Sequence, residues 1–260
     1  MTTTAKDINN TNNSSTRKEL NLYFTAGIPQ LQDTTQILKV LQEAGADRIE
    51  IGIPYSDPVA DGVVIQKAHE LALRNGMTIQ ILLDQLESVK EEIYIPILLM
   101  GYINPILSFG FEHFCEKCAK AGVRGLIIPD LPAIEFERTY RQLLEKYGLN
   151  FSFLVTPETP VERIKYLDLL SSGFLYAVSS SSTTGNSNKN ETSESYLKTL
   201  ASLDLKNPVM IGFGIQSTED FQKATRFSKG GIIGTALVRI LLENDNWEEK
   251  ASQFVQGIKE

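Results

Sequence analysis

Short hydrophobic runs rich in β-forming residues recur along the chain, and amphipathic segments separate them. The runs, which we expect to form strands, cover residues 22–26, 47–51, 95–100, 125–129, 151–155, 174–178, 209–212 and 231–234. After the first run, Thr34, Ile37 and Leu41 recur at the spacing of one helix face. Strands that alternate with helices favour parallel pairing, and eight such units can close into a TIM (β/α)8 barrel. A doubly wound open sheet is the alternative fold, although no G-x-G-x-x-G motif follows the first strand.

The chain length agrees with one such barrel. At 260 residues the chain is close to the roughly 250 residues typical of this fold, so we expect a single α/β domain over residues 18–260. Residues 1–17 are rich in Thr, Asn and Ser and contain almost no large hydrophobic side chain. Such a segment cannot bury enough surface to stay ordered, which predicts a disordered tail.

Composition excludes several classes of partner. The hydrophobic fraction of 42% and the charged fraction of 22% are ordinary for a globular protein. A net charge of -7 with scattered Lys and Arg is not the pattern of a protein that binds nucleic acid or an anionic membrane. The sequence has no apolar run of about 18 residues and no signal-peptide pattern, so we expect a cytoplasmic protein without a spanning helix.

Cysteine and histidine are sparse. Cys115 and Cys118 form a C-x-x-C motif with His113 nearby, but these positions spread around a helix and no second Cys/His pair completes a zinc site. We therefore interpret both cysteines as reduced structural thiols and expect no metal. His69 is the only other histidine, and its context predicts the surface of a helix, which argues against acid–base catalysis by histidine.

Glu50 is an acidic residue within the second hydrophobic run. Because side chains alternate along a strand, Glu50 points away from Ile49 and Ile51 and shares its face with Arg48. Burial raises the pKa of a glutamate, which can then hold and release a proton near neutral pH. A structural ion pair with Arg48 or another cation is the alternative.

In a barrel of this kind, catalytic groups belong at the carboxyl ends of the strands and in the loops that follow. Polar residues at these places include Tyr55, Asp57, Asp61, Tyr102, Asn104 and Asp130, of which we expect Asp57 and Asp130 to be structural. The polar stretch at 179–193 is either a lid or a disordered insertion. The glycine turns at Gly214 and Gly234, with the Thr235 hydroxyl, favour a phosphate site, although glycine also serves tight turns.

Several motifs together resemble the α subunits of tryptophan synthase, from about Leu22 to Val238. They read E-I-G-I-P-Y-S-D-P-V-A-D-G, G-Y-I-N-P, I-P-D-L-P, S-S-S-S-T-T-G, I-G-F-G-I and I-I-G-T-A. The resemblance implies the aldolytic cleavage of indole-3-glycerol phosphate to indole and glyceraldehyde 3-phosphate without a cofactor. It also implies a β subunit that uses pyridoxal phosphate and receives the indole, in an α2β2 heterotetramer.

The resemblance assigns roles to individual residues. Glu50 would move protons, Asp61 would accept a hydrogen bond from the indole N–H, and Thr184 would orient Asp61 when the lid closes. Tyr176 would line the site, the phosphate would lie at Gly185, Gly214, Gly234 and Thr235, and the indole pocket would comprise Tyr23, Met100, Ile127, Phe213 and Ile232. Any one of these pocket residues could instead be an ordinary core side chain. Ser182 and Thr183 replace the Gly-Val that the family commonly has in the lid.

Two other functions remain open. The chain could be a mainly regulatory α subunit, or a barrel isomerase of a phosphorylated sugar in which Glu50 and Asp61 form a base and acid pair. We expect the β subunit to dock near the loops at 54–61 and 102–110, because Pro105, Ile106 and Leu107 are apolar and lie beside the predicted barrel mouth.

Overall fold

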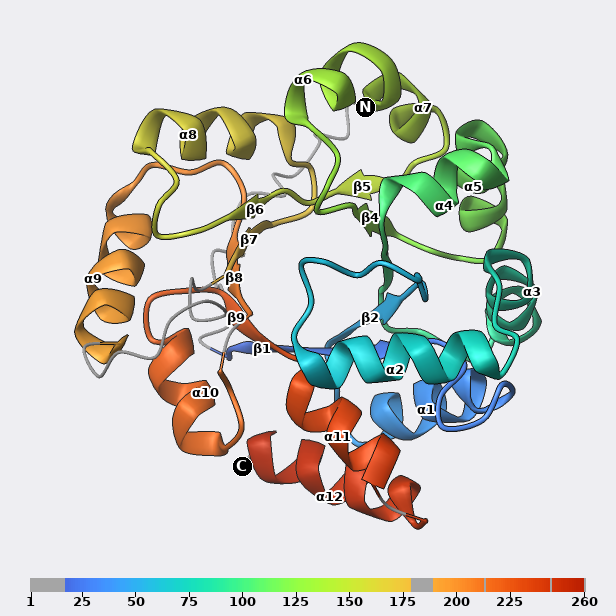
Figure 1. Cartoon of the computed structure of the whole chain (residues 1–260). Helices are drawn as coiled ribbons and strands as arrows, with labels where there is room; N and C mark the ends of the chain where they lie inside the picture. The colour runs from blue at the N-terminus through green and yellow to red at the C-terminus, as the bar shows by residue number, and fades with distance from the viewer. Residues whose placement is uncertain (1–16, 179–188, 213, 244, 260) are drawn as a thin grey trace, which may run out of the picture.

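The computed structural model describes residues 17–178, 189–212, 214–243 and 245–259, which form a ring of parallel strands surrounded by helices (Figure 1). The strands are β1 (Glu19–Thr25), β2 (Arg48–Gly52), β3 (Ile97–Met100), β4 (Gly125–Ile127), β5 (Asn150–Phe151), β6 (Leu154–Val155), β7 (Leu175–Ala177), β8 (Val209–Ile211) and β9 (Gly230–Ile233). The helices are α1 (Asp33–Glu43), α2 (Val63–Arg74), α3 (Ile79–Val89), α4 (Ile103–Phe109), α5 (Phe111–Lys120), α6 (Ala133–Glu135), a π-helical turn η1 (Phe136–Tyr140), α7 (Arg141–Lys146), α8 (Val161–Leu170), α9 (Lys189–Ser202), α10 (Thr218–Thr225), α11 (Thr235–Glu243) and α12 (Trp247–Lys259).

The strands close into a barrel. Their order is β5-β4-β3-β2-β1-β9-β8-β7-β6, and every neighbouring pair is parallel. The two terminal strands follow each other in the chain, and the backbone between them extends both ladders: the N–H of Ser152 donates to the carbonyl of Leu126 at 3.2 Å, and the N–H of Tyr176 donates to that of Phe153 at 2.9 Å. The predicted (β/α)8 barrel is confirmed, and the open sheet is wrong.

One predicted strand, residues 151–155, is interrupted and forms β5 and β6 instead. The cause is two serine hydroxyls that accept backbone N–H groups at the break. The Ser152 hydroxyl accepts from Phe174 and the Ser171 hydroxyl accepts from Phe153, each at 3.2 Å. These side chains offer the backbone a partner other than a neighbouring strand, which interrupts the regular ladder locally.

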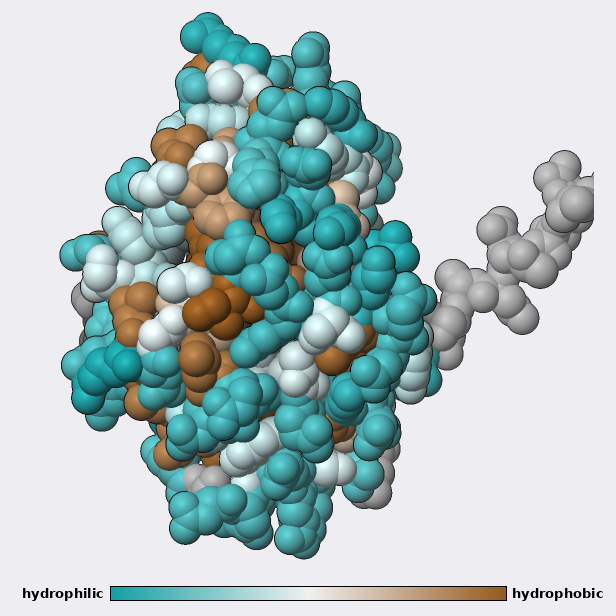
Figure 2. Space-filling model, turned by 90° about the vertical axis from the view of Figure 1, so that its right-hand side faces the viewer, coloured by the Kyte–Doolittle hydropathy of each residue, from teal (hydrophilic) through white to brown (hydrophobic). Residues whose placement is uncertain are grey.

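Two hydrophobic layers hold the barrel. The outer layer lies between the sheet and the helices and contains Ile49 and Ile51 of β2 together with Ile37 and Leu41 of α1. The inner layer is a separate cluster inside the ring: Leu98, Ile127, Phe174, Tyr176, Met210 and Ile232. On the flank shown in Figure 2, hydrophilic residues cover most of the surface and hydrophobic residues gather near its centre.

The predicted tail at residues 1–17 lies outside the described residues except for Arg17, so its disorder stays a prediction. Within the residues that the structure describes, we find no helix long and apolar enough to cross a membrane.

Candidate active site

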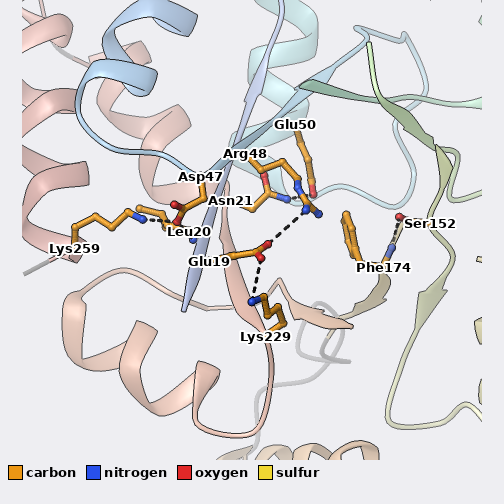
Figure 3. A network of polar contacts seen from close by, with 10 residues as sticks. All are labelled: Glu19, Leu20, Asn21, Asp47, Arg48, Glu50, Ser152, Phe174, Lys229 and Lys259. Carbon is orange, nitrogen blue, oxygen red and sulfur yellow. Dashed lines mark hydrogen bonds and ion pairs between the residues drawn. The ribbon is translucent and has the colours of Figure 1, made fainter. Parts of the chain in front are cut away.

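Glu50 points into the barrel. Its side chain is fully buried, and its Oε1 accepts a hydrogen bond of 2.5 Å from the Asn21 Nδ2 (Figure 3). Oε2 has no hydrogen-bond partner among the described residues. Burial raises the pKa of Glu50 from its ordinary 4.5 to about 8, against the smaller opposing effects of the Asn21 hydrogen bond and the Arg48 charge. At neutral pH the side chain is therefore mostly a neutral acid with a proton to give.

The ion pair considered as an alternative for Glu50 is made by another residue. Arg48 places its Nη2 3.4 Å from the Glu19 Oε2, and the Lys229 Nζ lies 3.4 Å from the other oxygen of Glu19 (Figure 3). The Arg48 guanidinium also lies over the Phe174 ring, 5.3 Å from its centroid. These contacts lie at the amino-terminal end of the barrel interior, and no cation among the described residues forms an ion pair with Glu50.

Two tyrosine rings occupy the barrel interior where glycines leave room for them. Tyr23 pairs with Glu50 in the sheet register and is 7% exposed. A Cβ on Gly52 would lie 2.2 Å from the Tyr23 hydroxyl, and a Cβ on Gly212 would lie 2.2 Å from the Tyr176 ring. Both distances are far below van der Waals contact, so the positions of the rings depend on the two glycines.

The structure brings most of the predicted indole-pocket residues together. Ile127, Ile232 and Tyr176 belong to the inner cluster, and Met100 packs against it. A small cavity of about 10 Å³ at the mouth is lined by Tyr23, Asp61, His69, Met100, Gly101, Tyr102 and Pro129. Phe213 lies outside the described residues. These residues share one region of the barrel interior, and the role of each as an indole contact stays a prediction.

Asp61 lies on the loop between β2 and α2, which arches over the barrel mouth (Figure 1). Its Oδ2 accepts a hydrogen bond of 2.8 Å from the Tyr102 hydroxyl, which itself accepts the Ala60 N–H at 3.0 Å. Burial, followed by the hydrogen bond to Asp61, raises the pKa of Tyr102 above its ordinary value. Tyr102 therefore remains a donor to the carboxylate.

His69 is not on the surface, as the sequence predicted, but is 3% exposed. It follows Ile65 by four residues and precedes Ala72 by three, and both of these lie on the buried face of α2. The helical period could therefore have placed it correctly. Its Nδ1 accepts the Tyr55 N–H at 3.1 Å, and its Nε2 lies 3.5 Å from the Asp61 Oδ2.

The predicted phosphate site is described only in part. Thr235 begins α11 and is preceded by Gly234, so free N–H groups of a helix start are available there. Gly214 follows β8 with a φ of +63°, a left-handed conformation that favours glycine. Thr184 and Gly185, like the whole stretch 179–188 with Ser182 and Thr183, lie outside the described residues. Anion binding at this end of the barrel stays a prediction.

Asp130 and the cysteines of the C-x-x-C motif have structural rather than chemical roles. Asp130 accepts the Ile103 N–H at 2.9 Å, which satisfies a backbone donor at the start of α4. Cys115 and Cys118 are free and buried, and burial raises the pKa of Cys115 to about 12, so it is not a reactive thiolate. Among the described residues, no group of His, Cys, Asp and Glu has the arrangement of a metal site.

Comparisons with known proteins agree over nearly the whole chain. A family model described as "Tryptophan synthase alpha chain" matches residues 10–259. The tryptophan synthase alpha chain of Flavobacterium johnsoniae is 48% identical over 244 residues, which cover 94% of this chain and 96% of that protein. The tryptophan synthase alpha chain of Bacteroides thetaiotaomicron is 46% identical over 253 residues, which cover 97% of this chain and 99% of that protein.

Solved structures show the same fold. The tryptophan synthase alpha chain of Legionella pneumophila matches with a TM-score of 0.84 at 32% identity, over 94% of this chain and 90% of that chain. A chain in the crystal structure of tryptophan synthase from M. tuberculosis matches with a TM-score of 0.81 at 30% identity, over 94% of this chain and 92% of that chain. The chain belongs to the tryptophan synthase alpha chain family.

Proposed function

We propose that this chain is an enzyme of tryptophan synthesis that cleaves indole-3-glycerol phosphate into indole and glyceraldehyde 3-phosphate. One observation carries the proposal: Glu50 is a buried, mostly neutral acid inside the barrel, and one of its oxygens makes no hydrogen bond to the described residues. A group of this kind can deliver a proton to a ring carbon and, once ionised, accept one from an alcohol.

The cleavage balances with Glu50 as its proton carrier. The acid form gives its proton to the indole carbon that bears the glycerol phosphate side chain, and the ring becomes a cationic indolenine. The resulting carboxylate then takes the proton of the hydroxyl on the adjacent side-chain carbon. A carbonyl forms there, the carbon–carbon bond breaks, and its electrons return to the ring as indole leaves. Glu50 ends as it began, protonated.

Asp61 supports this step by electrostatics. Positive charge develops on the ring nitrogen when the ring carbon is protonated, and a carboxylate that accepts the N–H hydrogen bond stabilises that charge. Asp61 is held at the mouth by Tyr102 and lines the same cavity as Tyr23 and Met100, where we expect the ring. The phosphate would bind at Gly185, at the glycine turns of Gly214 and Gly234 and at Thr235 at the start of α11, and Thr184 would orient Asp61. The protonated ring itself accepts the electrons of the broken carbon–carbon bond, so the cleavage needs only proton transfers from this chain and calls for no cofactor in it.

The same proposal includes a β subunit, which would hold pyridoxal phosphate and form an α2β2 assembly. A groove of about 810 Å³ on the β2–α2 loop and α2 supports a docking surface beside the mouth. It includes Val59, which is 86% exposed, and Val63, which is 67% exposed. Ile106, which we predicted to be part of an exposed patch, is buried because α4 turns it toward the core, whereas Leu107 is exposed.

The direct test measures indole release from indole-3-glycerol phosphate by the purified chain, with and without a β subunit. We expect release by the chain itself, loss of most of it in Glu50→Gln and in Asp61→Asn, and normal release in Glu43→Gln, the same change on the exposed end of α1. Substrate binding without turnover by the wild-type chain would favour a regulatory subunit instead. Turnover of a phosphorylated sugar in place of this substrate would favour the isomerase.

A further inference from the structure

His69 is a buried imidazole beside the site for which the proposed cleavage has no role. Its Nε2 makes no hydrogen bond within the part of the chain that the structure describes, yet it lies 3.5 Å from the Asp61 Oδ2 in a 3% exposed side chain. A buried polar atom without a partner is costly, so its position next to a carboxylate requires an explanation. A movement of about 0.5 Å would bring the two atoms to hydrogen-bond distance.

The backbone determines which nitrogen of His69 carries the proton. The Tyr55 N–H points to Nδ1 at 3.1 Å. Because an amide N–H can only donate, Nδ1 must accept, and an accepting nitrogen carries no hydrogen. The proton of the neutral ring is then on Nε2, directed at Asp61.

A second donor to the same oxygen is aligned in the same way. The Ala60 N–H donates to the Tyr102 hydroxyl, so the hydroxyl proton is free to go to the Asp61 Oδ2. Tyr55 and Ala60 both lie on the β2–α2 loop that carries Asp61. Two backbone N–H groups of one loop thus aim two side-chain donors at one carboxylate oxygen.

We propose that His69 is a positioning residue, whose Nε2–H holds the Asp61 Oδ2 together with Tyr102 and leaves Oδ1 to accept the N–H of the substrate ring. This inference rests on the proposed function in its last step. Among the described residues, no hydrogen bond is made to Oδ1 of Asp61, which agrees with its being the oxygen presented to a ligand.

The first test needs no substrate. The chain has two histidines, so a protein labelled with ¹⁵N-histidine gives two imidazole spin systems, and His113→Gln assigns them. His113 lies on α5 with its side chain 52% exposed and is the solvent-exposed reference. At pH 7.5 we expect His69 to be the Nε2–H tautomer. A ring protonated at Nδ1, alone or together with Nε2, would overturn the inference.

The second test separates the two contacts of His69. In His69→Gln the side-chain amide reaches the place of Nε2 and can still donate to Asp61, whereas in His69→Asn it reaches only the place of Nδ1 and can still accept from Tyr55. Positioning through Asp61 predicts that Asn lowers kcat by about 10-fold or more, the range for lost supporting contacts, while Gln stays within about 3-fold. Both variants are first compared with the wild type by circular dichroism and thermal unfolding.

Every other kinetic pattern overturns the inference. If the Asn variant has a higher kcat than the Gln variant, His69 acts by holding the loop through Tyr55, and if both variants keep the wild-type kcat, it has no positioning role. Equal losses in both variants indicate a packing role. Failure of the proposed function is distinguishable, because then the wild-type chain itself releases no indole, while the tautomer measurement still decides the geometry at His69.

Discussion

Replacing Glu50 with glutamine is expected to stabilise the fold while removing catalysis. Glutamine has the shape of the neutral acid, and its carbonyl oxygen can accept the hydrogen bond that Asn21 donates to the Glu50 Oε1. The glutamate is ionised in the unfolded chain at neutral pH but mostly protonated in the buried site, so folding has to take up a proton. Glutamine has no proton to take up.

The size of the effect follows from the raised pKa. The folded pKa of about 8 lies above the ordinary 4.5, so the stability contributed by Glu50 is full below pH 4.5 and is lost progressively as pH rises to about 8. At roughly 1.36 kcal/mol per pH unit, the loss is about 1 kcal/mol at pH 5 and about 3 kcal/mol at pH 7. Glu50→Gln does not suffer this loss. Its free energy of unfolding, relative to that of the wild type, should therefore increase by about 2 kcal/mol between pH 5 and pH 7.

Urea unfolding of both proteins at pH 5, 6 and 7, followed by circular dichroism, measures this difference. All other titrating groups are shared, so the pH dependence of the difference in unfolding free energy reports Glu50 alone. Glu43→Gln, an exposed glutamate, is the control and should show no such trend. If the difference in unfolding free energy between the two proteins is the same at pH 5 and pH 7, the Glu50 carboxyl is not buried as described.

Three further outcomes follow from the same contacts. In the proposed mechanism the acid form of Glu50 starts the cycle, so kcat/KM should fall above pH 8 with a single basic limb near the pKa of about 8, and a profile level to pH 9.5 would contradict this. Gly212→Ala should displace the Tyr176 ring, which lowers kcat/KM and reduces the free energy of unfolding by about 1–3 kcal/mol. Gly257→Ala, whose added Cβ meets nothing within 4 Å, should reduce neither quantity. Val59→Glu should weaken binding of a β subunit measured by calorimetry, whereas Leu169→Glu, an exposed control on α8, should not; equal affinities would place the partner elsewhere.

Periodicity was enough to predict the barrel. Hydrophobic runs of strand length alternate with helical spacing along the whole chain, and every predicted run corresponds to at least part of a strand in the structure. The break at Ser152 and Phe153 was not predictable, because it depends on side-chain hydroxyls that meet the backbone only in the folded ring. The early start of β1 at Glu19 depends on pairing with β9, more than 200 residues away in the sequence.

The sequence placed single residues of the candidate site, whose roles stay predictions, but it did not predict the contacts between them. Alternation along β2 was enough to place Glu50 inside, whereas its partner Asn21 comes from the neighbouring strand and carries no signal of its own. From the sequence, Arg48 was an equally plausible ion-pair partner for Glu50. In the folded sheet it pairs with Glu19 instead. The prediction that His69 lies on the helix surface was wrong. It followed from the polarity of the side chain, whereas the spacing from Ile65 and Ala72 indicates the buried face of α2.

The contacts of Arg48, Glu19, Lys229 and Phe174 bear on where the proposed product could leave the barrel. Among the described residues, these contacts fill the amino-terminal end of the barrel with charge and an aromatic ring. If the proposed cleavage releases indole inside the barrel, the part of the chain that the structure describes leaves the carboxyl-terminal rim as its exit. Whatever protein covers that rim decides whether the molecule reaches solvent at all.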